Sequence, residues 1–142
     1  MDKIDRIILG VLARDGRISF RDLGDKVHLS PNATAERVRK LQQSGAIRAI
    51  RAEINPAALG QPLEVQIDVK LESGTAASTF ERVLAGMPQV KSATLMTGSF
   101  DYAVRVNCAD RDELVRVTEA LRAKGGVRET YSRMILREVG LG

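Results

Sequence analysis

The first 45 residues have the apolar spacing of three short helices. The opening apolar positions recur three and four residues apart, which places them on one face of a helix: Ile4, Ile7, Ile8, Val11 and Leu12. Asp2 is positioned to cap the start of this helix, and Asp15–Gly16 to end it. The spacing therefore predicts a helix directly after the N-terminus, with one face turned towards a core.

Two further helices are expected, and each has a capping residue before it. Ser19 precedes the second helix, with an acidic residue three positions on, as in a capping box. Ser30 and Pro31 open the third as N-cap and first helical residue, where the missing N–H of proline costs nothing. His28–Leu29 is the turn between them, and Gly45 is placed to close the third helix in a left-handed conformation. Their inner positions are Leu23, Val27, Thr34, Val38 and Leu41.

The segment from Ala46 to Ile54 alternates isoleucine with charged residues, which predicts a short strand pair or an extended arm. Residues 55–62 contain two prolines and a glycine, a composition typical of a linker. We therefore expect one domain over residues 1–54, a hinge over 55–62 and a second domain over 63–142.

Beyond residue 62 the apolar pattern changes from helical spacing to strict alternation. Leu63 to Leu71 predicts a strand, followed by a helix that stops at Pro88, strands over 90–97 and 101–107, and a helix capped by Asp110. A last strand falls within 127–139. The order strand-helix-strand-strand-helix-strand is that of ferredoxin-like folds, so the chain is predicted to be α+β.

The net charge of +4 is not spread evenly over the 142 residues. The first 53 residues contain 11 Lys+Arg against 7 Asp+Glu, whereas the remainder contains 11 of each. This asymmetry favours a head that binds a polyanion, joined to a neutral body.

Other classes of protein find little support in the composition. The longest apolar runs are too short for a membrane span, and the charged N-terminus does not resemble a signal peptide, so a cytoplasmic location is expected. The single Cys108 excludes an intrachain disulfide and a cysteine zinc site, and the lone His28 has no second histidine with which to bind a metal. We therefore expect no catalytic residues, no metal site and no cofactor.

A helix-turn-helix places its second helix in the major groove of DNA, and this role falls to the predicted third helix. Asn32 is suited to adenine and an arginine to guanine, while the basic residues farther along, with Arg48 and Arg51, are suited to phosphates. The N-terminal amides of the helix, near Ser30, can also hold a phosphate oxygen. The expected DNA-binding residues are Ser30, Asn32, Ala35, Glu36, Arg37, Arg39, Lys40, Arg48 and Arg51.

Three alternatives remain open at this point. The first is an ordinary three-helix unit with a solvated polar face, which has the same spacing. The second is a stand-alone small-molecule sensor that acts through a partner protein, and the third is a small enzyme with a helical cap. The basic excess, the Ser-Pro helix start and the strand pair after Gly45 favour DNA binding over the ordinary three-helix unit.

Several segments resemble the Lrp/AsnC, or feast/famine, family of transcription regulators. The similar segments of the first domain are 4–8, 15–19, 29–31, 37–41 and 44–48. Asn55–Pro56 and Leu59–Gly60 resemble the hinge of the family, and residues 97–102 (TGSFDY) its effector loop. The likeness runs from about residue 2 to residue 138, and the order and spacing of the motifs make it specific.

The resemblance implies an N-terminal winged helix-turn-helix that binds double-stranded DNA, followed by a ferredoxin-like βαββαβ domain. That second domain is expected to form a homodimer that assembles further, to an octamer. It is also expected to hold a small effector, usually an amino acid, between subunits. The effector residues implied are Thr97, Gly98, Ser99, Phe100, Asp101, Arg128 and Ser132.

The predicted loop also has the chemistry to bind an amino acid. Asp101 can accept hydrogen bonds from an ammonium group, and the amides of Gly98 and Ser99 can donate to a carboxylate. A plain hairpin turn, in which Asp101 satisfies its own backbone, is the alternative. Phe100 departs from the tyrosine that the family often has, which removes one hydroxyl from the loop.

Overall fold

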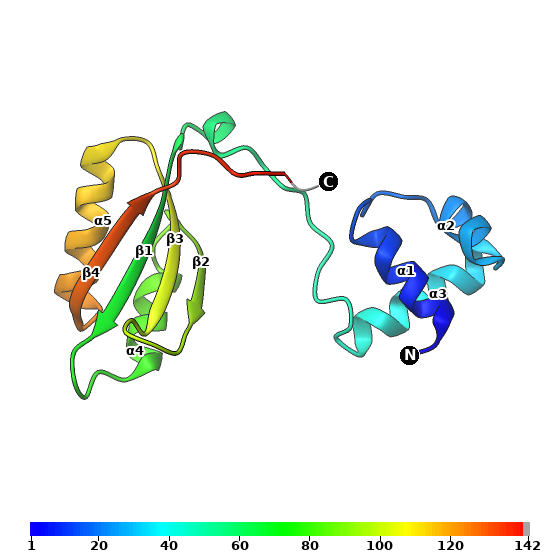
Figure 1. Ribbon diagram of the computed structural model, residues 1–142, viewed down its shortest axis with the longest axis horizontal. Helices are drawn as coiled ribbons and strands as arrows, with labels where there is room; N and C mark the ends of the chain where they lie inside the picture. The colour runs from blue at the N-terminus through cyan, green and yellow to red at the C-terminus, as the bar shows by residue number, and fades with distance from the viewer. Residues whose placement is uncertain (141–142) are drawn as a thin grey trace. The chain divides into compact units, whose positions relative to one another are not determined.

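The computed structural model describes residues 1–140 and divides the chain into two compact units, the first over Met1–Glu53 and the second from Ile54 onwards (Figure 1). The first unit, here called the head, contains three α-helices and no strand. The second contains a four-stranded sheet with two helices, so the chain is α+β. Within residues 1–140, no helix is long and apolar enough to cross a membrane.

The head consists of α1 (Lys3–Leu12), α2 (Phe20–Val27) and α3 (Pro31–Gln43), as the apolar spacing predicts. Each helix contributes its apolar face to one small core. The fully or nearly buried apolar side chains of this core are Ile8, Leu23, Val27, Val38 and Leu41.

The predicted caps hold the ends of these helices. Asp2 and Asp5 form a capping box at the start of α1, and Ser19 accepts a hydrogen bond from the Asp22 amide at the start of α2. His28 lies in the left-handed conformation, with φ of 57°, and turns the chain from α2 towards α3. α1 ends at Leu12, three residues before the predicted Asp15–Gly16.

The strand pair expected between Ala46 and Ile54 does not form, and this segment is the extended arm instead. Only Ile47 packs against the core of the head, anchored by its amide, which donates to the Leu41 carbonyl over 2.9 Å. Residues 46–54 contain no strand, so the extended arm, the second of the two predicted forms, is the one observed.

The second unit begins with a 3-10 turn, η1 (Pro56–Leu59), which Asn55 caps and Gly60 ends. The strands and helices then follow in the order βαββαβ. Their bounds are β1 (Leu63–Leu71), α4 (Ala77–Ala85), β2 (Val90–Leu95), β3 (Tyr102–Cys108), α5 (Arg111–Lys124) and β4 (Val127–Met134).

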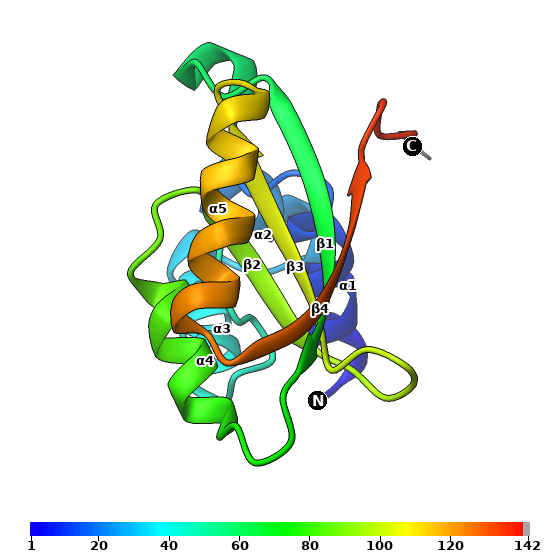
Figure 2. The same cartoon turned by 90° about the vertical axis from the view of Figure 1, so that its left-hand side faces the viewer.

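The four strands form one antiparallel sheet in the order β2-β3-β1-β4, and α4 and α5 cover one of its faces (Figure 2). Residues directly opposite each other in an antiparallel pair share a face. Ile67, Val104 and Ser132 are on the helix face, because Ile67 pairs with both of the others and is fully buried. Asp68, Ala103 and Tyr131 are on the open face, which no helix covers.

Candidate functional site

The start of α3 fixes the outward face of that helix. The Ser30 hydroxyl accepts a hydrogen bond from the Ala33 amide over 3.2 Å, and the Thr34 hydroxyl donates to the Ser30 carbonyl over 2.9 Å. Thr34 is fully buried, together with Val38 and Leu41 farther along the same side. The opposite side of α3 is therefore the one that remains available to a partner.

The approach of α2 to α3 depends on a glycine. A Cβ atom on Gly24 would lie 2.5 Å from the carbonyl oxygen of Leu29 and 3.0 Å from the hydroxyl oxygen of Thr34. The Gly24 carbonyl also accepts hydrogen bonds from the amides of His28 and Leu29. The close crossing required by a helix-turn-helix exists here because position 24 has no side chain.

Asn32, Glu36 and Arg39 form one stripe on the outward side of α3, since they are spaced by four and three residues. Asn32 and Arg39 are exposed, and the Glu36 side chain is 42% exposed. Ala35 lies at the edge of this stripe and is half-buried. Gln43, four residues after Arg39, continues the stripe and was not among the expected DNA-binding residues, although its spacing places it there.

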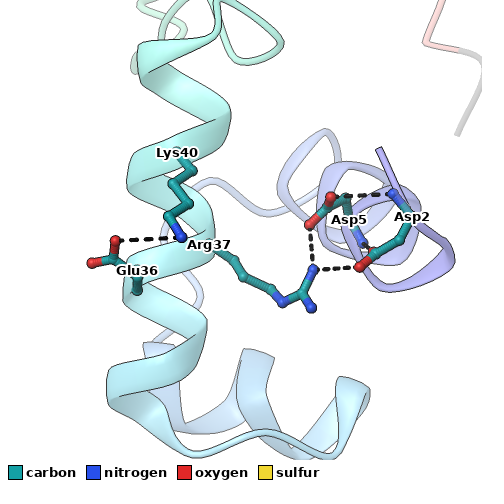
Figure 3. A network of polar contacts seen from close by, with 5 residues as sticks. All are labelled: Asp2, Asp5, Glu36, Arg37 and Lys40. Carbon is teal, nitrogen blue, oxygen red and sulfur yellow. Dashed lines mark hydrogen bonds and ion pairs between the residues drawn. The ribbon is translucent and has the colours of Figure 1, made fainter.

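Arg37 contacts α1 instead of pointing into solvent (Figure 3). Its Nη1 donates to Asp2 Oδ2 over 2.7 Å and to Asp5 Oδ1 over 2.9 Å. The Asp5 amide, and after it the Arg37 guanidinium, hold the pKa of Asp2 below its usual value. The same bonds to Asp2 and Asp5 raise the pKa of Arg37. This ion-pair cluster joins the first turn of α1 to the middle of α3.

A second charged group lies on the same helix. Arg39 donates a hydrogen bond to Glu36 Oε2, and Lys40 Nζ lies 3.9 Å from Glu36 Oε1. The bond from Arg39 is the main cause that lowers the pKa of Glu36. The outward face of α3 thus presents a carboxylate together with two cations.

The arm after α3 adds positive charge beside α1. Arg48 and Arg51 are exposed and, with Arg14, line an open cavity of about 610 Å³ that also includes Gly16 and Glu53. Ile50 reaches back towards Gly16, where an added Cβ would lie 3.1 Å from an Ile50 methyl group. The arm therefore passes close to the loop after α1.

The turn between β2 and β3 is closed by backbone hydrogen bonds. The Met96 amide donates to the Asp101 carbonyl over 2.9 Å, and Gly98 adopts a φ of 110°, a conformation that favours glycine. Thr97, Gly98 and Ser99 are exposed at the tip. The tip offers amides and hydroxyls to solvent, as the sequence suggested.

Asp101 is tied to the neighbouring strand β1. Its Oδ2 accepts from the Leu71 amide over 2.8 Å, its own amide donates to the Val69 carbonyl over 2.8 Å, and Lys70 Nζ lies 3.8 Å from its Oδ1. One carboxylate oxygen is therefore committed to the backbone, and the other already faces a cation. This leaves Oδ1 as the atom that a ligand's ammonium group can contact, in competition with Lys70.

A shallow cavity of about 340 Å³ adjoins Asp101 and is lined by residues of β1, α4, β2 and β3. Tyr102 forms part of its wall and donates its hydroxyl to Glu81 Oε1 over 2.7 Å. Burial, and then the Glu81 carboxylate, raise the pKa of Tyr102 to about 12, so its hydroxyl stays protonated. Lys70 was not predicted as a site residue, because its nearness to Asp101 follows from the pairing of β1 with β3. Tyr102 was not predicted either, because its place in the cavity wall and its bond to Glu81 depend on the fold.

The other residues of the expected effector site are distributed over both faces of the sheet. Phe100 packs near Tyr131 of β4, with ring centroids 6.4 Å apart, on the open face. Ser132 is on the helix face, and Arg128 is exposed at the irregularity where β4 begins. Among residues 1–140, no hydrogen bond or ion pair joins Arg128 or Ser132 to the turn. One chain therefore brings Asp101 and the turn together, but not the two β4 residues.

Comparison with protein families gives a match for each unit. Residues 1–42 match the AsnC-type helix-turn-helix domain, and residues 64–140 match the Lrp/AsnC ligand binding domain. The second match alone covers more than half of the chain.

Curated relatives cover nearly the whole length. The leucine-responsive regulatory protein of Haemophilus influenzae is 35% identical over 143 aligned positions, which cover 98% of this chain and 86% of the relative. The leucine-responsive regulatory protein of Escherichia coli K12 is 34% identical, with 98% and 87% covered.

Solved structures agree. A transcriptional regulator from Neisseria meningitidis in complex with L-Met has a TM-score of 0.88 at 28% identity, with 99% of this chain and 92% of that chain covered. The leucine response regulatory protein of Mycobacterium tuberculosis has a TM-score of 0.85 at 30% identity, with 97% and 94% covered. The chain is a member of the Lrp/AsnC family of DNA-binding transcription regulators, with a helix-turn-helix domain and a ligand-binding domain, and is not an enzyme.

Proposed function

We propose that this regulator reads a specific double-stranded DNA site through the outward stripe of α3, and that an amino acid bound beside Asp101 changes its assembly or its DNA binding. The observation that carries the first part is the stripe of Asn32, Glu36 and Arg39 opposite the buried side of α3. Amide, carboxylate and guanidinium are the groups that distinguish bases in the major groove.

Phosphate contacts are assigned to groups around this stripe. Arg48 and Arg51 of the arm, with Lys40 and the amides after Ser30, are suited to the DNA backbone. Arg37 is removed from this set, because both Asp2 and Asp5 hold it within the head. Replacing Arg48 or Arg51 by Ala is expected to make the salt dependence of DNA binding shallower by about one unit of slope each.

An amino acid is the effector class that we propose. A carboxylate oxygen at Asp101 and free amides at Gly98 and Ser99 match the two charged ends of a free amino acid. Support also comes from the relatives, since two are named leucine-responsive and one was solved with L-Met. Because Arg128 and Ser132 lie away from the turn in one chain, we propose that they complete the site only from a second copy.

We propose a homodimer that assembles further, to an octamer, in the cytoplasm, where the DNA of bacteria is. The open face of the sheet and the exposed apolar side chains next to it support self-association. Tyr131 is 57% exposed on this face, and Leu136, just beyond β4, is 94% exposed. Two heads on one scaffold would bind half-sites about one helical turn apart, or a multiple of it.

The test combines DNA binding with ligand titration. Selection from a random duplex library by the full-length protein should enrich a pseudo-palindromic site, and calorimetry with leucine and methionine should detect binding. Failure to enrich any sequence would contradict the DNA-reading proposal. If none of the twenty amino acids gives a binding heat or changes the sedimentation of the protein, the effector proposal is contradicted and the DNA-reading proposal is not.

A further inference from the structure

Glu36 is the one acidic side chain among the 13 residues of α3, and it lies in the middle of the outward stripe. It follows Asn32 by four residues and precedes Arg39 by three, so it is flanked on both sides along the helix. Acidic residues on a surface intended for DNA need a reason, because duplex DNA carries one negative charge for about every 1.7 Å of its axis.

Helix stabilisation is a weak reason for this carboxylate. Its contacts with Arg39 and Lys40 are pairs three and four residues apart on an exposed surface. Such pairs contribute little to a helix and are screened by salt. The bond from Arg39 lowers the pKa of Glu36, so the carboxylate stays ionised and still has acceptor capacity for a further donor.

The bases differ in what they offer to such an acceptor. In the major groove guanine and thymine present acceptors, adenine presents a donor beside an acceptor, and cytosine presents its N4 amino donor alone. An ionised carboxylate is therefore attracted to cytosine and repelled by the acceptors of the other bases.

Arg39 completes the match to one base pair. A C·G pair presents the cytosine amino donor next to the O6 and N7 acceptors of guanine. The Glu36–Arg39 pair presents an acceptor next to donors, joined by their own hydrogen bond. We propose that Glu36 is a specificity-determining residue that accepts a hydrogen bond from a cytosine amino group, with Arg39 held beside it for the guanine of the same base pair. This inference rests on the proposed entry of α3 into the major groove.

The experiment is selection from a random duplex library by full-length wild type, Glu36→Gln and Glu119→Gln. Glu119 is exposed on α5, so its variant has the same change in charge outside the head. Wild type and Glu119→Gln should enrich the same C·G pair in each half-site. Glu36→Gln should change that position towards adenine, because an amide pairs with N6 and N7 of adenine, and should leave the other positions unchanged.

Affinities for single duplexes give the second readout. Exchanging that C·G pair should weaken wild type about tenfold or more, and should weaken Glu36→Ala clearly less, because that variant keeps only the Arg39 contact with guanine. Identical enrichment by Glu36→Gln and wild type would overturn the inference and leave the proposed function intact. Loss of all enrichment by a folded Glu36→Gln would also overturn it, since the residue would then serve binding rather than base choice. If wild type itself enriches nothing, the proposed function fails, and the inference fails with it.

Discussion

Replacement of Gly24 by alanine probes the packing that presents α3 to DNA. The new methyl carbon would lie 2.5 Å from the Leu29 carbonyl oxygen and 3.0 Å from the Thr34 hydroxyl oxygen. The first atom is backbone and cannot rotate away, and the second is fixed by its bond to Ser30. The methyl group must therefore push the end of α2 away from the start of α3.

The magnitude follows from two opposing effects. Overpacking of this kind costs about 1–3 kcal/mol, whereas alanine gains about 1 kcal/mol over glycine inside a helix. Because the clash is with backbone, we expect a net loss of about 1–2 kcal/mol for Gly24→Ala. Gly10→Ala in α1 is the matched control, since no atom lies within 4 Å of its added Cβ, and it should gain about 1 kcal/mol.

Native-state hydrogen exchange on the full chain measures the effect in the head alone. Amides of α2 and α3 should exchange about tenfold faster in Gly24→Ala and more slowly in Gly10→Ala, while those of β1 and β3 stay unchanged. Equal or greater protection of α3 in Gly24→Ala would show that the close crossing of α2 and α3 does not depend on Gly24.

Three further outcomes are expected. Arg37→Met should lower the melting temperature of the head, because it removes the ion pairs with Asp2 and Asp5. It should leave the slope of log K against log salt for DNA binding unchanged. A slope shallower by about one would instead identify Arg37 as a phosphate contact. Asp101→Asn keeps an acceptor for the Leu71 amide and should leave the sheet folded. Calorimetry should show leucine or methionine binding weakened about tenfold or more. Unchanged affinity would remove Asp101 from the site. Folding raises the pKa of Tyr102 from 10.0 to about 12, so the unfolded chain releases the hydroxyl proton at a lower pH than the folded chain. The sheet domain should therefore lose stability as the pH rises from about 10 to about 12. Urea unfolding across this pH range should show the decrease in unfolding free energy in wild type and a smaller decrease in Tyr102→Phe.

Local sequence signals predicted the helices and strands well. Ser30 and Pro31 mark the start of α3 through the chemistry of the first helical turn, and Gly45 marks its end through a positive φ of 76°. The alternation from Leu63 to Leu71 likewise reports directly which side chains are buried. These features depend on neighbours in the chain, so the sequence alone contains the information.

Contacts between distant segments were beyond such signals. Arg37 looked like a phosphate contact, because its partners Asp2 and Asp5 are 35 and 32 residues earlier. Asp101 looked free for a ligand, whereas one of its oxygens binds the Leu71 amide, 30 residues earlier. The faces of Tyr131 and Ser132 depend on the register of β4 against β1, which the apolar pattern of an edge strand specifies only weakly.

The function proposed for this protein depends on the outward stripe of α3 reading DNA. The most direct measurement is the affinity of full-length wild type and Arg39→Ala for the selected duplex and for a scrambled duplex, over a series of salt concentrations. Wild type should show log K falling linearly with log salt, and Arg39→Ala should lose about tenfold or more on the selected duplex with little change on the scrambled one. Affinity that does not respond to salt, or an Arg39→Ala variant with wild-type preference, would contradict the claim.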